Sequence, residues 1–480
     1  MKHVCIRERS YYDVASFSRL CKLNEEVAYE QLKTLCSKNV VRYRTEDDFD
    51  EFDTDGDRLK AGKYQFRFVG LALTDKLVVV VYPKYMSKEP SSLQLRMLLR
   101  VIRKRSGSYT LFDQYSQEGL IGDKRISLIL ELLESYFEYG EYSNYVEQLE
   151  DNGFGGISWE RTISSFTPYL SNGQPVYFDF KTRKTRRNET DLITRIHHAV
   201  LSDCFKELRE CNLLEVFEVD DTDISHEELD ELGDIEPLIG LLQSERSRQF
   251  MTWKLHVLNL LIIYLEGALL NYQNSRIQCL GTTSFHVDWE KACKTCFGDM
   301  LNRKISDIGI ELNGPWKALN RTRLIDVIPT PEWHVVNMDG QDISCSDPRT
   351  FIPDLVTVQP DERAFYILDA KYYVPILRAG KKLVGQPGVE SVAKQFLYQE
   401  AYSKFVIDNK FSKVVNAFFV PTCEQNARLI GTVTIPGVLD SGCGPFSSIV
   451  EMWAIPADLL FSKYLSGERM SLPSFGGLSR

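Results

Sequence analysis

The chain has 480 residues, of which 43% are hydrophobic and 26% are charged, and its formal net charge is −10 at pH 7. This composition is that of a globular protein with room for two to four domains, and it excludes a chain that is disordered as a whole. The acidic balance argues against indiscriminate binding to nucleic acid. It does not argue against binding through a local basic patch, because charges farther apart than about 10 Å are largely screened by salt.

Neither a signal peptide nor a membrane anchor is predicted. The first ten residues, MKHVCIRERS, contain no apolar core of the kind that a secretion signal needs, and no apolar run reaches membrane-spanning length. The 11 cysteines are scattered and odd in number, which favours reduced thiols in such a chain. These features predict a cytoplasmic protein that does not bind a membrane.

The first 150 residues are predicted to form an N-terminal region. Helices are expected at 14–20 and 25–38, with Asn24 as the cap between them. Strands at 64–73 and 77–82 and amphipathic helices at 91–104 and 126–139 are expected to follow. The helix pair is compatible with a winged helix-turn-helix that binds DNA or a partner, although helix pairs are common in other proteins. The glycine-rich stretch at 152–156 predicts a boundary after this region.

Residues 151–280 are predicted to form a central, largely helical region that begins with a strand at 174–182 and continues with helices at 191–208 and 249–270. The strand leads into the densest basic cluster of the chain: Lys181, Arg183, Lys184, Arg186 and Arg187. A second basic group covers the end of the helix at 91–104: Arg96, Arg100, Arg103, Lys104 and Arg105. Such clusters contact nucleic-acid backbones. The alternative is that they pair with acidic segments, of which the densest are at 47–57 and 218–236.

Residues 281–480 are predicted to form a third region in the order helix, hairpin, helix, strand. A helix with Ser284 as its cap carries Glu290. The β-branched and aromatic runs at 355–358 and 364–368 predict a β-hairpin, because the Pro-Asp pair between them breaks the strand. A helix at 389–409 then carries Gln395 and Tyr398, and strands are expected at 414–420, 429–435 and 449–455.

Three charged side chains lie at the ends of the predicted hairpin strands. Asp354 precedes the first strand, and Asp369 and Lys371 end the second. Because successive strand residues point to opposite faces, Asp369 and Lys371 share a face and Asp354 can lie beside Asp369. Two adjacent ionised carboxylates are costly unless a hard cation such as Mg²⁺ lies between them, and the lysine could then activate water or stabilise charge on a phosphate. The alternative is a structural salt bridge.

These residues match the PD-(D/E)xK pattern of a large nuclease superfamily. The pattern is short and recurs by chance, but the helices that precede and follow the hairpin occur in the order that the resemblance implies. The resemblance implies an α/β (α+β) fold with a mixed sheet flanked by helices. It also implies one or two Mg²⁺ ions, for which Mn²⁺ is expected to substitute. The implied ligands are Glu290, Asp354, Asp369 and the Ala370 carbonyl, with Lys371 to activate water or stabilise charge and Gln395 to orient the site.

Longer stretches resemble one nuclease family more closely. The runs GGISWERTISSFTPYLSNGQPVYFDFKTRK, TTSFHVDWEKACKTCFGDML and IPDLV…YILDAKYY are similar to those of the nuclease subunits of LlaJI-type restriction systems, relatives of the McrC component of McrBC. This resemblance implies a DNA endonuclease of phage defence that works with a McrB-like GTPase of the AAA+ class. The sequence contains no GxxxxGK[ST] string, so we expect the partner and not this chain to bind nucleotide. The segment at 159–270 is expected either to dock that partner or to form ordinary core.

Two other functions stay open. The same site would suit a standalone or repair nuclease, which would cleave DNA without GTP or a partner. A catalytically inactive nuclease scaffold that binds DNA or assembles a complex is the second alternative. The clustered carboxylates speak against the scaffold, because a site freed from chemistry has no physical need for them.

Overall fold

The computed structural model describes residues 2–45, 62–106, 120–122, 124–188, 191–211, 213–217, 220, 224, 227–269, 279–336, 342–346, 349–376, 380, 383–437 and 444–475. These residues fall into two compact units. The first unit draws on Met1–Gly107, Tyr115–Gly122 and Cys279–Arg480, and the second on Ser108–Gln114 and Asp123–Gln278. The N-terminal and C-terminal parts of the chain therefore share one unit, whereas the sequence analysis expected three consecutive regions at 1–150, 151–280 and 281–480. The acidic run at 47–57 lies outside the described residues, and no described helix meets the length and hydropathy of a membrane span.

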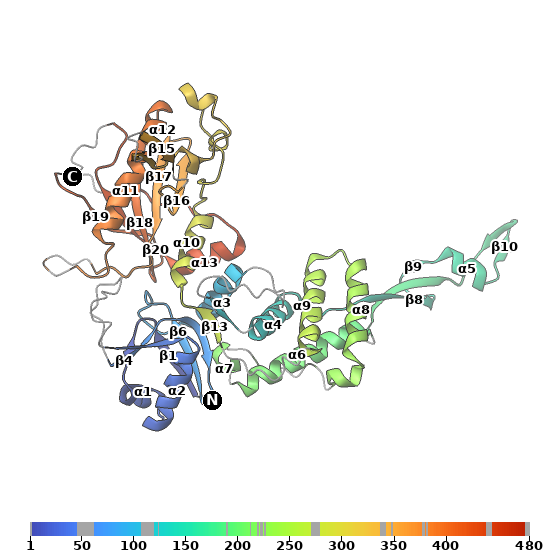
Figure 1. Ribbon diagram of the computed structural model, residues 1–480. Coiled ribbons are helices and arrows are strands. Elements are labelled where there is room, and N and C mark those ends of the chain that lie inside the picture. The colour runs from blue at the N-terminus through green and yellow to red at the C-terminus, as the bar shows by residue number, and fades with distance from the viewer. Residues whose placement is uncertain are drawn as a thin grey trace. The chain divides into compact units, whose positions relative to one another are not determined.

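The N-terminal part of the first unit contains two sheets and a helix pair (Figure 1). The predicted pair is confirmed as α1 (Val14–Cys21) and α2 (Glu25–Ser37), and the Asn24 side chain caps α2 by accepting a hydrogen bond from the Val27 amide. One sheet has the order β2-β4-β3 and the other the order β1-β6-β5-β13-β7. Their strands are β1 (Lys2–Arg7), β2 (Tyr11–Tyr12), β3 (Val41–Arg44), β4 (Lys63–Phe66), β5 (Val69–Leu73), β6 (Leu77–Tyr82), β7 (Leu120–Gly122) and β13 (Cys279–Thr282).

Strand β13 follows the second unit in the sequence but belongs to the N-terminal sheet, where it lies antiparallel between β5 and β7. Gly70 of β5 pairs with Gly281 of β13, and the backbones approach closely there. A Cβ atom on Gly70 would lie 2.2 Å from the Leu280 carbonyl oxygen, and one on Gly281 would lie 2.3 Å from that of Val69. Glycine on both strands therefore permits the pairing. The chain then enters its C-terminal part from within the N-terminal sheet.

The C-terminal part is built on a mixed five-stranded sheet of order β16-β17-β18-β20-β19. The predicted hairpin is confirmed as β16 (Leu355–Gln359) and β17 (Ala364–Ala370), which pair antiparallel. Strands β18 (Lys413–Thr422) and β20 (Val450–Pro456) continue the sheet in parallel, and β19 (Arg428–Val433) closes it antiparallel. The mixed α/β fold with a C-terminal mixed sheet is confirmed.

Helices cover both faces of this sheet (Figure 1). Ala364, Tyr366 and Leu368 of β17 pack in one core with α10 (Phe285–Cys296) and α13 (Ala457–Ser466). Phe365 and Ile367 pack in the opposite core with α12 (Ser403–Asp408). The helix predicted at 389–409 is interrupted at the buried Tyr402, so α11 (Val389–Ala401) precedes α12. Smaller elements before the hairpin are η4 (Ile305–Asp307), η5 (Gly314–Lys317), η6 (Leu324–Val327), β14 (Glu332–Val336) and β15 (Asp342–Ser346).

The second unit combines a helical body with an arm of strands (Figure 1). The body consists of α4 (Lys124–Tyr139), α6 (Leu192–Glu210), α7 (Leu213–Phe217), η2 (Leu229–Leu232), α8 (Ile235–Arg248) and α9 (Thr252–Leu269). The arm consists of β8 (Tyr145–Asp151), β9 (Gly156–Ile157), α5 (Trp159–Ser165), β10 (Tyr169–Ser171), β11 (Gln174–Val176) and β12 (Lys181–Arg187). The strand expected at 174–182 is therefore two strands.

The glycine-rich stretch at 152–156 lies inside the arm, whereas the sequence analysis expected a boundary there. It connects β8 to β9, and both strands pair with β12. A Cβ atom on Gly155 would lie 2.0 Å from the Arg183 carbonyl oxygen. The glycine thus serves a close approach of two backbones within one sheet.

Two residues of the second basic group, at the end of α3 (Ser92–Ser106), contact the C-terminal part of the first unit. The Lys104 ammonium donates to the Tyr464 carbonyl oxygen at 2.5 Å. Arg105 forms a buried ion pair with Asp288 of α10, with 3.0 Å between Nη1 and Oδ2, and also donates to the Thr282 hydroxyl at 2.8 Å. Lys104 and Arg105 therefore hold α3 against the C-terminal part of the first unit.

The buried ion pair predicts a large loss of stability when one partner is removed. Arg105→Met should lower the free energy of unfolding by about 3–5 kcal/mol, because Asp288 is then left as an uncompensated buried charge. Urea denaturation followed by circular dichroism measures this loss. The matched control is Arg428→Met, which breaks the exposed Arg428–Glu424 pair of 3.0 Å and should cost less than about 1 kcal/mol. Equal losses in the two variants would contradict the prediction.

Candidate active site

The hairpin brings two aspartates together at one end of the C-terminal sheet. Leu355 pairs with Leu368, so the next residues outward, Asp354 and Asp369, lie opposite each other. The Asp354 Oδ2 atom accepts a hydrogen bond from the Ala370 amide at 3.1 Å, which fixes the carboxyl group against the end of β17. The predicted placement of Asp354 beside Asp369 is confirmed.

The Asp369 carboxyl group makes Asp354 harder to ionise. Burial raises the pKa of Asp354 well above its usual range, and the hydrogen bond to Asp369 and the charges of Asp369 and Glu290 raise it further. Asp369 is 5% exposed, and its Oδ1 atom has no hydrogen-bond partner among the described residues. A buried carboxylate oxygen without a partner costs free energy unless another group binds it.

Lys371 lies on the same face as Asp369, as the strand alternation predicted. Its ammonium is 2.9 Å from Asp369 Oδ2, and its backbone amide donates to the Phe419 carbonyl oxygen at 2.9 Å. Burial works to lower the pKa of Lys371, but the charge and hydrogen bond of Asp369 outweigh it, so the pKa is raised. The protonated lysine suits the stabilisation of negative charge better than the removal of a proton from water at neutral pH.

Glu290 and Tyr398 border the carboxylate pair. Glu290 lies on α10, where its Oε1 atom pairs with the Lys294 ammonium at 2.5 Å. The Tyr398 hydroxyl on α11 donates to the Ile352 carbonyl oxygen at 3.2 Å. Burial and the charges of Asp369 and Asp354 raise the pKa of Tyr398 to about 12, which reflects how close the ring is to both carboxyl groups.

Gln395 is fully buried on α11, and neither atom of its amide group has a partner among the described residues. Burying an amide group without hydrogen-bond partners costs free energy, and a group bound at the site that supplied those partners would remove this cost. Whether it orients the site stays a prediction.

The site fits a hard divalent cation. Asp354 and the unpartnered oxygen of Asp369 could supply carboxylate ligands, and the Ala370 carbonyl stays a predicted third donor. Within the described part of the chain, no group of three or more His, Cys, Asp or Glu side chains that could hold a metal ion is found, and the role of Glu290 stays a prediction. Mg²⁺ is suited to such a site, because it commonly keeps several waters and binds one or two carboxylates together with substrate phosphate.

The first basic cluster lies on strand β12 of the arm and not in the first unit. Lys184 is 3.6 Å and Arg186 is 2.9 Å from Glu150 of the neighbouring strand β8. Lys181 pairs with Asp151, and Arg183 lies 4.0 Å from Glu147. The side chain of Arg187 lies outside the described residues. These exposed pairs contribute little to stability, so the basic side chains stay available to other anions.

The sequence analysis gave no role to two N-terminal residues that reach the hairpin. Glu8 and Lys84 both contact Tyr372, the residue directly after Lys371. No local pattern reveals such contacts, because Glu8 and Tyr372 are 364 positions apart in the chain.

A model of the family described as LlaJI restriction endonuclease matches residues 68–439. The Type II restriction enzyme BsuMI component YdjA of Bacillus subtilis (strain 168) is 24% identical over 421 residues, which cover 86% of this chain and 83% of that protein.

Two solved assemblies from Thermococcus gammatolerans contain chains that are similar to this one. In a half-complex of McrB AAA+ hexamers with bound McrC, the similar chain is 13% identical, with 97% of this chain and 99% of that chain covered and a TM-score of 0.34. In the McrBC complex, the similar chain is 17% identical, with 57% and 89% covered and a TM-score of 0.19.

The two adjacent carboxyl groups predict that removing one of them raises stability but weakens ion binding. Asp354→Asn removes a carboxyl group whose ionisation is opposed by burial and by Asp369, but it keeps an oxygen that accepts from the Ala370 amide. Without divalent ions, this variant should be more stable than the wild type by on the order of 1 kcal/mol. Thermal unfolding with and without Mg²⁺ measures both effects, because the wild type should gain stability from the ion and the variant should gain much less. A variant with the same Mg²⁺ response as the wild type would contradict the assignment of Asp354.

Proposed function

The chain belongs to the LlaJI restriction endonuclease family, and from this premise we propose that it is the Mg²⁺-dependent DNA-cleaving subunit of a restriction system for defence against foreign DNA. The observation that carries the proposal is the unpartnered, buried oxygen of Asp369 beside Asp354. Two adjacent carboxylates that can bind a metal ion, with the Lys371 ammonium 2.9 Å from Asp369, are sufficient groups for metal-assisted hydrolysis of a phosphodiester.

Each residue of the site has a distinct part in this proposal. Asp354, Asp369 and the Ala370 carbonyl hold the ion, and Glu290 contributes from α10. Bound Mg²⁺ would supply an activated water and neutralise charge on the scissile phosphate, and Mn²⁺ is expected to substitute. The Lys371 ammonium stabilises the negative charge that develops on the phosphoryl oxygens. Gln395 orients the group bound at the site.

We further propose that a McrB-like GTPase of the AAA+ class is the partner of this chain. The sequence contains no GxxxxGK[ST] string that would bind a nucleotide in this chain, so GTP-driven movement requires another polypeptide. The arm of the second unit is the proposed docking element, because large apolar side chains are exposed on it. They include Leu170 at 77%, Phe178 at 69% and Tyr169 at 65% exposure. Neighbouring exposed apolar residues of this kind commonly mark a protein interface.

The proposed chemistry predicts the loss of cleavage on single substitutions. Asp369→Ala and Lys371→Ala should each lower the rate of plasmid cleavage by at least about 100-fold, because each removes a ligand or the stabilising charge. Lys413→Ala is the matched control, since Lys413 pairs with Glu362 at the opposite end of the same strands, 2.7 Å away, and should cut normally. Undiminished cleavage by Asp369→Ala would remove this site from consideration.

The requirement for a partner is tested in the same assay. Plasmid DNA and Mg²⁺ are incubated with this chain alone, and with this chain, the product of a neighbouring GTPase gene and GTP. Cleavage only in the second mixture is the expected result. Cleavage by the chain alone would favour a standalone or repair nuclease. If neither mixture cleaves the plasmid and the chain does not bind Mg²⁺, an inactive scaffold is favoured.

The basic strand β12 is proposed to contact DNA phosphates. The double variant Lys184→Ala and Arg186→Ala should bind DNA more weakly for all sequences, and the slope of log affinity against log salt should become shallower by about two. Fluorescence anisotropy over a range of salt concentrations measures the slope. Lys206→Ala on α6 is the control in the same unit, because Lys206 is exposed and lies 4.0 Å from Glu228. A salt slope equal to that of the wild type would argue that β12 does not bind phosphates.

A further inference from the structure

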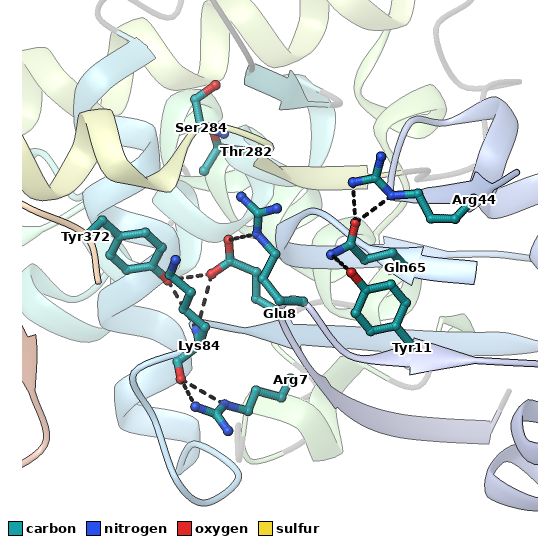
Figure 2. A network of polar contacts seen from close by, with 10 residues as sticks. Arg7, Glu8, Tyr11, Arg44, Gln65, Lys84, Thr282, Ser284 and Tyr372 are labelled. Carbon is teal, nitrogen blue, oxygen red and sulfur yellow. Dashed lines mark hydrogen bonds and ion pairs between the residues drawn. The ribbon is translucent and has the colours of Figure 1, made fainter. Parts of the chain in front are cut away.

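A buried glutamate from the N-terminal part of the chain reaches the catalytic hairpin. Glu8 follows β1 and is 8% exposed. Its Oε2 atom accepts a hydrogen bond from the Tyr372 hydroxyl at 2.5 Å and another from the Lys84 amide at 3.2 Å. The Lys84 amide also approaches the Tyr372 hydroxyl oxygen at 3.2 Å. Figure 2 shows how the three residues converge.

The Tyr372 ring is enclosed as well as hydrogen-bonded. Its centroid lies 5.3 Å from that of Phe285, the first residue of α10, and 6.4 Å from that of Tyr85. The Lys84 ammonium lies 4.9 Å from the ring centroid. The ring is therefore held by residues of the N-terminal part and by the helix that carries Glu290.

Tyr372 controls the direction of Lys371 through the backbone. Strand β17 ends at Ala370, and the Lys371 amide makes the last hydrogen bond to β18, at the Phe419 carbonyl oxygen. Because neighbouring residues of an extended chain point to opposite faces, Tyr372 packs in the core beside α10 while Lys371 points toward Asp369. A rotation of the backbone that released Tyr372 would therefore also turn Lys371 away from Asp369.

Packing alone does not require a carboxyl group at this point. Burial raises the pKa of Glu8, although the charge of Lys84 and the hydrogen bond of Tyr372 oppose the rise. An apolar side chain of similar size would avoid this cost of burial. A hydrogen bond is directional, however, so the carboxyl group holds the tyrosine in one position where apolar contacts would allow it to slide.

We propose that Glu8 is a positioning residue of the nuclease, which holds Lys371 in its working direction by anchoring Tyr372. The N-terminal part of the chain is then a constituent of the active site and not only a separate module for DNA or a partner. The inference rests on the proposed function, because it assigns a purpose to the direction of Lys371.

The test compares variants that remove or keep the anchor. Glu8→Ala and Tyr372→Phe should each lower kcat for plasmid cleavage by at least about 10-fold, because small displacements of a reacting group are costly. The KM for DNA should change by less than about 2-fold, since the anchor does not touch the substrate. Glu8→Gln should keep kcat within about 3-fold of the wild type, because its amide oxygen can accept both hydrogen bonds.

A matched control is available in the same part of the chain. The Tyr11 hydroxyl accepts a hydrogen bond at 2.8 Å from the buried Gln65, in a separate chain of contacts (Figure 2). Tyr11→Phe removes a tyrosine hydroxyl from a buried polar contact that does not include the hairpin. It should leave kcat unchanged, whereas a loss of kcat equal to that of Tyr372→Phe would mean that stability and not positioning is responsible.

Hydrogen exchange supplies a measurement that does not depend on cleavage. In Glu8→Ala, the amides of Lys371 and Tyr373 should exchange at least about 10-fold faster, while those in the middle of β17 stay protected. Unchanged exchange at Lys371, or a Glu8→Ala variant that cuts as fast as an active wild type, would overturn the positioning role. A wild type that cuts under no condition would instead overturn the proposed function, so the two failures are distinguishable.

Discussion

The juxtaposition of the carboxyl groups of Asp354 and Asp369 is the constraint on which the candidate site depends. Asp354 and Asp369 lie opposite each other only because the β16–β17 hairpin has one register, and that register is set by side chains that alternate between two cores. A slip of one residue would turn Phe365 and Ile367 toward the wrong helices. The hydrophobic effect on both faces of the sheet therefore holds together two groups that would otherwise separate.

The N-terminal and C-terminal parts form one functional body. Strand β13 belongs to the N-terminal sheet and leads directly into α10, the helix that carries Glu290. The buried Arg105–Asp288 pair fastens α3 to the same helix, and Glu8 contacts Tyr372, the residue directly after Lys371. Of these three connections, the Glu8–Tyr372 contact lies directly beside Lys371. The N-terminal part therefore borders the site, in addition to any separate role that it has.

The second unit presents a different kind of surface. Its arm carries both exposed large apolar side chains and basic residues, of which Lys184 and Arg186 pair with Glu150 on β8. Such a surface is costly to leave in water, and it suits contact with other macromolecules. In the proposed function, the first unit would hold the chemistry and the second unit would offer surfaces for recognition and assembly.

The sequence by itself determined the elements whose signals are local. Period-two alternation and a Pro-Asp break predicted the hairpin, and with it the approach of Asp354, Asp369 and Lys371. The same means could not distinguish two basic clusters of similar composition. Lys104 and Arg105 at the end of α3 contact the C-terminal part of the first unit, whereas Arg183, Lys184 and Arg186 of β12 are exposed. Only the tertiary structure decided this difference, the place of the glycine-rich stretch and the contact of Glu8 with Tyr372, because each depends on which distant segment packs against it.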